Sequence, residues 1–179
     1  MGRLSARHCV GALVPDERSL AVGRLNPSRA ARGHNREEET VISSNPNCEA
    51  VMDMLRRQYN ERDLSAVDQY IAEDHGDHNP MPGQGQGRAA VRQVIGDVLE
   101  SAETINVEIH DCFGEGDMVA TRYTVTVTPK EKFFGVDARG KTLSMHIVGV
   151  DRLQDLQIIE SWGESNMLAV LQAHAESVA

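Results

Sequence analysis

Within this 179-residue chain the spacing of the apolar residues changes from a helical to a strand period, and the change sets its fold class. In the first part of the domain, apolar side chains recur every three to four positions, the period of a helix with one buried face. Later, apolar and polar residues alternate, which is typical of strands with one face in a core. The helical stripes predict three leading helices, at 51–59, 65–71 and 90–99, and a closing helix at 166–175. The alternating segments predict four strands, at 105–110, 118–128, 142–153 and 156–162.

Helices followed by strands with short connections predict an α+β fold, in which the helices pack on one face of an antiparallel sheet. "GEGD" at 114–117 reads as a hairpin turn between the first two strands, and a very short turn joins the last two. A strongly curved sheet wrapped over helices leaves a hollow at its open end. An apolar hollow with a few polar groups is where a small ligand binds, so the element order predicts a small-molecule pocket.

The N-terminal region differs in charge from the rest of the chain. Residues 1–33 carry six arginines and two acidic residues, a net charge of +4; because the whole chain carries −9, the remainder carries −13. We interpret 1–46 as a basic, disordered extension and 47–179 as the folded domain. The acidic domain argues against nucleic acid as the main partner. No apolar run is long enough for a membrane span, so we expect no membrane partner.

The three cysteines, Cys9, Cys48 and Cys112, are far apart in the sequence. They form no CxxC pair and do not pair evenly, so neither a disulfide framework nor a cysteine zinc site is expected. This usage fits a reducing compartment, and we expect the protein to be cytoplasmic.

The stretch "EDHGDHNPMPG", residues 73–83, places His75 and His78 three positions apart among carboxylates. One interpretation is a divalent-metal site formed by both histidines and the neighbouring aspartates, which needs further ligands from elsewhere. The other is a loop at the pocket rim, in which His78 acts as a base or hydrogen-bonds a carbonyl. We favour the rim loop and expect no metal. The glycine-rich segment that follows, 83–87, is interpreted as a flexible lid.

Three segments resemble the SnoaL-like polyketide cyclases, members of the nuclear-transport-factor-two-like superfamily. They are "YNERDLSAVDQYIAEDHGDHNPMPG" (59–83), "EGDMVATRYTVT" (115–126) and "FFGVDARGKTLSMHIVGVDRLQDLQIIESWGESNMLAVLQ" (133–172). Shared features include Tyr59-Asn60, His78-Asn79-Pro80, Phe134-Gly135, Gly140-Lys141, Arg152, Ile158, Glu160 and Trp162. The resemblance extends over about residues 47–175, in the expected order.

The resemblance implies a cone-shaped α+β barrel, with a curved, mostly antiparallel sheet around three N-terminal helices and a deep pocket, and commonly a homodimer. It also implies cofactor-independent acid/base chemistry on a small, hydrophobic, polyketide-like carbonyl substrate. In the family, a base removes a proton α to a carbonyl and an ester cyclises by an intramolecular aldol reaction. We therefore expect such a compound as the substrate, and no cofactor.

The sequence departs from the family where the acid/base aspartate is found. The cyclases carry this aspartate directly after the position of Trp162, where this chain has Gly163. Ser161 stands where relatives often have histidine, and Gly149 stands at another polar position of the third strand. A glycine transfers no proton, so the cyclase mechanism does not carry over directly.

Nine residues are predicted to form the site. The catalytic set is His78, His146 and Glu164, and the substrate-binding set is Tyr59, Asn79, Arg122, Tyr123, Trp162 and Asn166. Adjacent residues of a strand point to opposite faces, so one of Arg122 and Tyr123 should reach the cavity. The face of His146 is left open, because a bulge would reverse it.

Two other functions fit the same fold. Gly163 favours a non-catalytic domain that binds a hydrophobic ligand or serves as an accessory to a partner. A hydrolase or hydratase would instead activate water with a carboxylate–amide pair such as Glu164 and Asn166.

Overall fold

The computed structural model describes residues 41–42 and 45–176, which belong to one unit of the chain, Glu37–Ala179. The basic extension predicted at 1–46 lies outside the described residues except at its C-terminal end. None of the helices in the described part of the chain has the length and apolar character needed to cross a membrane.

A six-stranded sheet forms one layer of the fold, in the order β1-β3-β4-β7-β8-β2. Its strands are β1 (Val41–Ile42), β2 (Ile71–Asp77), β3 (Ala102–Glu115), β4 (Met118–Pro129), β7 (Leu143–Gln154) and β8 (Gln157–Ser165). The central pairs are antiparallel, whereas β1 and β2 join the two edges in parallel. A separate small hairpin pairs β5 (Lys132–Phe133) with β6 (Val136–Asp137).

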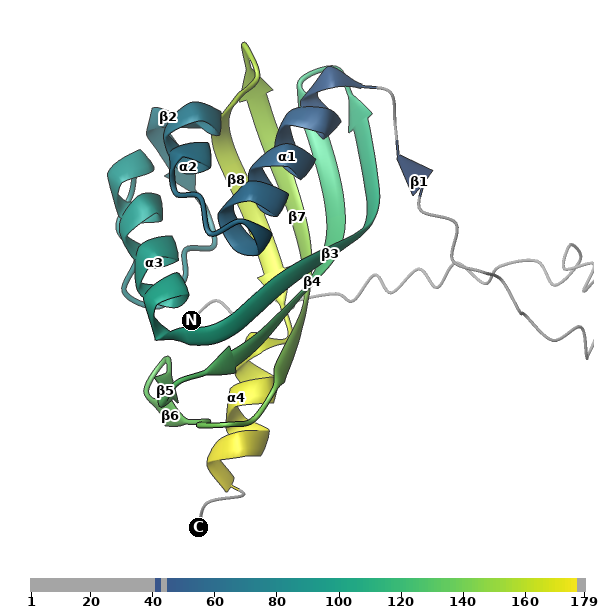
Figure 1. The fold of residues 1–179 in the computed structure, drawn as a ribbon. Coiled ribbons are helices and arrows are strands. Elements are labelled where there is room, and N and C mark those ends of the chain that lie inside the picture. The colour runs from purple at the N-terminus through teal and green to yellow at the C-terminus, as the bar shows by residue number, and fades with distance from the viewer. Residues whose placement is uncertain (1–40, 43–44, 177–179) are drawn as a thin grey trace, which may run out of the picture. The chain divides into compact units, whose positions relative to one another are not determined.

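Three helices precede the long strands and one follows them: α1 (Pro46–Asn60), α2 (Ser65–Tyr70), α3 (Arg88–Ser101) and α4 (Met167–Glu176). The first three lie together on one face of the curved sheet, and α4 continues from β8 at its end (Figure 1). Helix α1 begins where the Asn45 side chain accepts a hydrogen bond from the Asn47 N–H at 2.8 Å. The predicted α+β class, with a mostly antiparallel curved sheet around three N-terminal helices, is confirmed.

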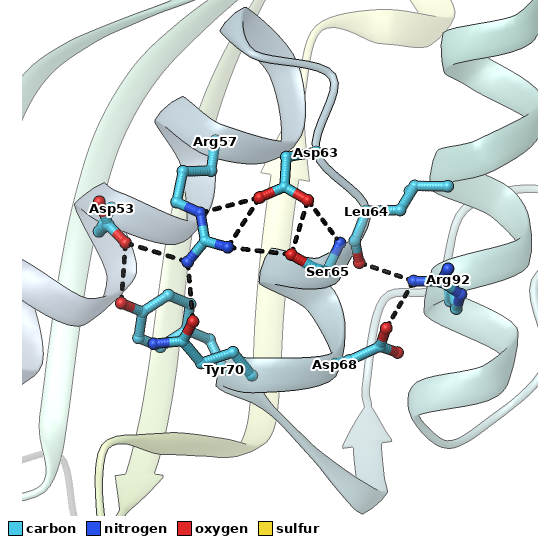
Figure 2. Close-up of polar contacts among 9 residues, drawn as sticks. Asp53, Arg57, Asp63, Leu64, Ser65, Asp68, Tyr70 and Arg92 are labelled. Atoms are coloured by element: carbon cyan, nitrogen blue, oxygen red, sulfur yellow. Dashed lines mark hydrogen bonds and ion pairs between the residues drawn. The ribbon is translucent and has the colours of Figure 1, made fainter.

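A polar network around Arg57 fastens α1 to α2 (Figure 2). The guanidinium donates to Asp63 Oδ2 from Nε at 3.1 Å and from Nη2 at 2.7 Å, and to Ser65 Oγ at 3.0 Å. Ser65 also donates to Asp63 through its hydroxyl and its backbone N–H. These bonds, with that of the Ser65 hydroxyl first, lower the pKa of Asp63 to about 2. On the other side of α2, Arg92 of α3 donates to Asp68 Oδ2 at 2.7 Å.

The prediction of a loop over the whole of 73–83 is wrong for its first five residues, which are part of a strand. Residues 73–77 belong to β2, which begins directly after α2 and pairs in parallel with β8. The strand is polar and has no regular apolar alternation, and its partner lies more than 80 residues away, so local pattern does not reveal it. Strand β1 and the β5–β6 hairpin, with two residues per strand, are too short to produce a recognisable period.

Candidate functional site

A cavity of about 220 Å³ lies between the helices and the sheet. Its helix side is apolar and is formed mainly by Val51, Met54, Leu55, Val91, Ile95 and Val98. Most of the polar groups in the lining come from the strands and from the loop after β2. The hollow predicted from the element order is therefore present, and its polar groups are the candidates for chemistry.

The strand period decides which side chains of β4 reach the cavity. The pairing of β4 with β7 is continuous, without a bulge. Thr121, Tyr123 and Val125 line the cavity, whereas Arg122 between them is exposed and donates to Asp111 Oδ2 at 2.6 Å. Of the two adjacent residues, Tyr123 is thus the one that faces inward.

Three side chains from three strands form a hydrogen-bonded chain in the cavity wall. Asp151 on β7 lies directly opposite Ser161 on β8, and the Ser161 hydroxyl donates to Asp151 Oδ1 at 2.6 Å. His75 on β2 places its Nε2 atom 2.9 Å from the same Ser161 oxygen. All three residues line the cavity, so Ser161 links a carboxyl group to an imidazole beside a space for a ligand.

The environment of Asp151 makes its carboxylate a stronger base than an ordinary aspartate. Burial raises the pKa of Asp151 from 3.8 to about 6, and the Asp77 carboxylate adds to this rise. The hydrogen bond from Ser161 lowers the pKa of Asp151, with an effect smaller than that of burial and larger than that of Asp77. A carboxyl group with this pKa is mostly ionised at pH 7 and can still take up a proton during a reaction.

His75 is almost completely enclosed, with 2% of its surface exposed. Burial lowers the pKa of His75, and the nearby Asp77 carboxylate opposes that shift only in part. Its Nδ1 atom has no hydrogen-bond partner, and it is the single buried side-chain nitrogen or oxygen in this condition among the described residues. The ring is therefore favoured in its neutral form, with one nitrogen bound to Ser161.

Two phenols, Tyr59 and the partly buried Tyr123, also line the cavity. Burial raises the pKa of Tyr59 to about 12, and it raises the pKa of Tyr123 well above its usual value. The carboxylates of Asp151 and Asp77 also raise the pKa of Tyr123. Both phenols thus keep their protons, and Tyr123 can donate a hydrogen bond on the side of the cavity that holds Asp151.

Five of the nine predicted site residues line the cavity: Tyr59, Asn79, Tyr123, Trp162 and Glu164. The Asn79 side chain donates to Glu164 Oε1 at 3.2 Å, which joins the loop after β2 to the end of β8. This bond occupies one oxygen of the predicted catalytic carboxylate.

The His78 side chain does not belong to the cavity lining. Its ring stacks on Trp162, with ring centroids 4.5 Å apart and planes 3° from parallel. Its Nε2 atom lies 3.3 Å from Glu160 Oε1, and the side chain is 46% exposed. Since Trp162 does line the cavity, His78 supports the wall from outside rather than facing a ligand.

Arg122, His146 and Asn166 border a different hollow on the opposite face of the sheet. His146 lies opposite Thr124, whose hydroxyl is 3.0 Å from His146 Nδ1, and both alternate with cavity-lining neighbours. The Asn166 side-chain oxygen accepts the His146 backbone N–H at 2.8 Å. Glu164 borders both hollows. The unbroken register therefore turns His146 away from the cavity, a point that the sequence left open.

Two glutamines attach the glycine-rich segment to β2. Gln84 Nε2 donates to Asp77 Oδ2 at 2.7 Å. Gln86 accepts the Asp77 N–H at 2.8 Å and donates to the Asp77 carbonyl at 2.9 Å. Gln84 also lines the cavity, so the segment predicted as a lid forms part of the wall.

The two histidines of the 73–83 stretch have different partners. His75 Nε2 contacts Ser161, whereas His78 Nε2 contacts Glu160. Across the described residues, no group of three or more histidine, cysteine, aspartate or glutamate side chains is arranged to hold a metal ion.

Asp151 and Ser161 are not among the site residues predicted from the sequence, where His75 was a candidate only as a metal ligand. One signal was available, because Asp151 lies two positions after Gly149 in a strand and so shares its face. The link to His75 was not available, since it depends on the unpredicted strand β2 and its register with β8.

A sequence profile of the SnoaL-like polyketide cyclase family matches residues 49–174. No curated protein matches the chain. Similar solved structures include TsrD from Streptomyces laurentii, which is 20% identical, with a TM-score of 0.65 over 74% of this chain and 97% of that one. AclR from Streptomyces galilaeus, a candidate hydroxylase, is 25% identical, with a TM-score of 0.63 over 75% of this chain and 98% of that one. IdmH from Streptomyces antibioticus, a candidate polyketide cyclase, is 22% identical, with a TM-score of 0.61 over 74% of this chain and 99% of that one.

The structural likeness extends over nearly the full length of these proteins, and it reflects a shared fold. The family profile covers the chain from α1 to α4. The chain therefore belongs to the SnoaL-like polyketide cyclase family.

Proposed function

We propose that this protein is an enzyme that performs acid/base chemistry on a small, neutral carbonyl compound, with Asp151 as the base. The observation that carries the proposal is a partly buried carboxyl group in the wall of an otherwise mostly apolar cavity, with a pKa of about 6. A base of this strength beside a bound ketone or ester suits removal of a proton from the carbon next to the carbonyl. Asp151 thus takes the role that relatives give to the aspartate after the tryptophan, where this chain has Gly163.

In the proposed reaction, the Asp151 carboxylate takes a proton from the α-carbon, and the electron pair of the C–H bond moves onto the carbonyl oxygen as an enolate. Tyr123, kept protonated by its environment, donates a hydrogen bond to that oxygen. The enolate carbon then attacks a second carbonyl of the same molecule, forming a carbon–carbon bond and an alkoxide. Asp151 returns its proton to the alkoxide, so the ring closes without loss or gain of atoms.

The cavity lining limits the substrate in charge and size. Among the described residues that line it, acidic side chains (Asp77, Asp151 and Glu164) are present and neither lysine nor arginine is. A free carboxylic acid would meet repulsion without a cationic partner, so a neutral ester or ketone is favoured. A volume of about 220 Å³ lies below the range of roughly 300–1,000 Å³ typical of sites for drug-sized ligands, which supports a compound of one or two rings.

The homodimer, the absence of a cofactor and the cytoplasmic location implied by the resemblance remain part of this proposal. The dimer is tested by light scattering during size-exclusion chromatography. A scattering mass near 20 kDa, against the 19.7 kDa of one chain, would contradict it.

The test uses a probe that reports proton abstraction without the natural substrate. The full-length protein is incubated in deuterium oxide with 2-tetralone, a neutral bicyclic ketone, and deuterium uptake at the α-carbons is followed by NMR. We expect uptake above the buffer rate, and loss of the excess in Asp151→Asn. The matched control is Asp155→Asn, which changes an exposed aspartate in the turn before β8.

Two outcomes would contradict the proposal. Exchange at the buffer rate with every ketone and ester of suitable size would remove the enzymatic function. A compound that raises the melting temperature and is recovered without exchange or change would support the alternative, a ligand-binding domain. A hydrolase based on Glu164 and Asn166 has less support, because Asn166 borders the other hollow.

A further inference from the structure

The Ser161 hydroxyl is the shared member of two hydrogen bonds in the cavity wall. Its oxygen is 2.6 Å from Asp151 Oδ1 and 2.9 Å from His75 Nε2. A serine hydroxyl has one hydrogen to donate and two lone pairs that accept. The direction in which Ser161 donates is therefore fixed by the protons that its two neighbours carry.

The unpartnered Nδ1 atom of His75 indicates which nitrogen holds the imidazole proton. Nδ1 is buried without a hydrogen-bond partner, in a residue that is 2% exposed. Buried N–H groups without an acceptor are rare because they lose their hydrogen bonds to water and gain none. The proton is therefore favoured on Nε2, where it donates to the Ser161 oxygen. The same argument disfavours the imidazolium form, which would place a second N–H at Nδ1.

With Asp151 ionised, this tautomer fixes the resting arrangement. His75 donates to Ser161, and Ser161 donates its single hydrogen to the Asp151 carboxylate. The other charged or titratable groups near the chain are Asp77 on β2, His78 after β2, Tyr123 on β4 and Tyr59 on α1. The Asp77 carboxylate accepts hydrogen bonds from the Asn79 N–H and the Gln84 side chain, so it has partners of its own.

We infer that Ser161 is a hydroxyl switch set by His75, which turns toward the substrate when Asp151 takes up the proton. The proton goes to Oδ1, the carboxyl oxygen that had accepted from Ser161, so Asp151 becomes a donor there and its new O–H bonds to the second lone pair of Ser161. Because His75 already donates to the first, the Ser161 hydrogen has no acceptor left in the wall. It rotates into the cavity and donates to the enolate oxygen that the same proton transfer has created.

The step balances in atoms and charge. The C–H bond breaks, an O–H bond forms on Asp151, and the electron pair moves to the carbonyl oxygen. The Ser161 O–H bond is only reoriented, and it turns back when Asp151 returns the proton. In the opposite tautomer, His75 Nε2 would accept a hydrogen bond, and the Ser161 hydrogen would have an acceptor in the wall. His75 is thus a positioning residue, and the inference rests on the proposed function.

The tautomer is tested without any substrate. Long-range proton–nitrogen NMR spectra of the full-length protein, labelled with ¹⁵N-histidine, are recorded between pH 6 and 8. We expect one neutral ring with its proton on Nε2, assigned to His75 by its absence in His75→Gln. A proton on Nδ1, or an imidazolium over this range, would overturn the switch whether or not the protein is active.

The switch itself is tested by the α-exchange rate. We expect Ser161→Ala to lower kcat by about 100-fold with little change in KM, because the donor acts only in the transition state. His75→Met, which has no N–H to donate, should lower kcat by a similar factor. His75→Gln offers an amide N–H near the position of Nε2 and should stay within about tenfold of the wild type. The double variant Ser161→Ala/His75→Met should be no slower than Ser161→Ala, because both substitutions abolish the same hydroxyl switch.

The outcomes separate the switch from the function on which it rests. Full activity of Ser161→Ala beside an inactive Asp151→Asn would overturn the switch and leave the proposed function standing. An inactive wild-type protein would remove the proposed function, and the switch with it. If His75→Met does not fold, as judged by circular dichroism, Ser161→Ala and His75→Gln still decide the question.

Discussion

Gly163 on β8 lies directly opposite Gly149 on β7, and both glycines border the cavity. A Cβ atom built on Gly163 meets no other atom within 4 Å. A Cβ atom on Gly149 would be 3.9 Å from Asp151 Oδ2 and 3.9 Å from Tyr123 Cε1, which is ordinary contact. The wall thus has space for a side chain at the position where relatives carry their aspartate, a short way from the carboxyl group that we propose as the base.

Gly163→Asp is expected to fold like the wild type and to raise the pKa of Asp151 above about 6. Two carboxylates near each other in a poorly solvated space disfavour each other's ionised form, so the pH at which half the activity appears should increase. The measurement is the pH dependence of kcat/KM for α-exchange. Gly163→Asn is the control, with a similar side chain and no charge, and should leave the midpoint unchanged. An equal midpoint in both variants would mean that the new carboxylate does not interact with Asp151.

Asp151→Asn is expected to inactivate the enzyme and to stabilise the fold above pH 6. Because the pKa of Asp151 rises from 3.8 to about 6 on folding, the folded protein holds this proton more tightly than the unfolded chain. Its contribution to stability is therefore full at low pH and is lost as pH rises through about 6. The loss amounts to at most about 3 kcal/mol, from the size of the shift.

Urea unfolding of the wild type and Asp151→Asn at pH 4 and pH 7.5 measures this difference. The free energy of unfolding of Asp151→Asn should exceed that of the wild type by more at pH 7.5 than at pH 4. Asp155→Asn, at an exposed site, should show no such dependence. A constant difference at the two pH values would contradict the raised pKa.

Asp63→Asn is expected to weaken the fold at neutral pH and to have less effect in acid. The pKa of Asp63 falls from 3.8 to about 2, chiefly through the Ser65 hydroxyl and then Arg57. A depressed folded pKa gives stability that is present above pH 4 and is lost as pH falls through about 2. Urea unfolding at pH 7 and pH 2.5 measures this change in stability. Glu61→Gln, outside the Arg57 network, is the control. If Asp63→Asn lowers the free energy of unfolding by as much at pH 2.5 as at pH 7, the lowered pKa of Asp63 is contradicted.

His78→Ala is expected to keep α-exchange within about tenfold of the wild type, because His78 lies outside the cavity lining. Its ring supports Trp162 by stacking, so the variant should mainly raise KM by loosening the wall. Steady-state kinetics separate KM from kcat. A fall in kcat as large as that of Asp151→Asn would return His78 to the role of base. His146→Ala, on the opposite face, should leave both constants unchanged.

The elements that could be predicted from the sequence are those in which a regular apolar pattern extends over many residues. The stripe of α3 and the alternation of β4 and β7 are each at least 12 residues long, so a misplaced boundary does not hide them. Strand β2 lacks such a signal, and its place depends on a partner strand near the other end of the domain. Non-local pairing of this kind is decided by the assembled core and not by local sequence.

Only part of the candidate site could be predicted, because some of its residues meet through non-local strand pairing. Tyr123 and Trp162 lie on long strands at the cavity wall, and the strand period had left Tyr123 as one of two candidates for the inward face. Asp151, Ser161 and His75 meet only because three strands are in a particular register. His78 belongs to the family triplet, which identifies the loop but not the direction of its ring. A histidine directly after the end of a strand, stacked on a tryptophan, looks the same in sequence as one that faces a ligand.

Helix α2 ends at Tyr70 and β2 begins at Ile71, with no connecting residues between them. One added or deleted codon at this junction would exchange the inward and outward sides of β2, and His75 would leave its place beside Ser161. The turn between β7 and β8 is exposed and carries none of these groups, so it should accept changes in length far more readily. Within this lineage, length variation should therefore accumulate at the tip of that hairpin and be selected against at the helix-to-strand junction.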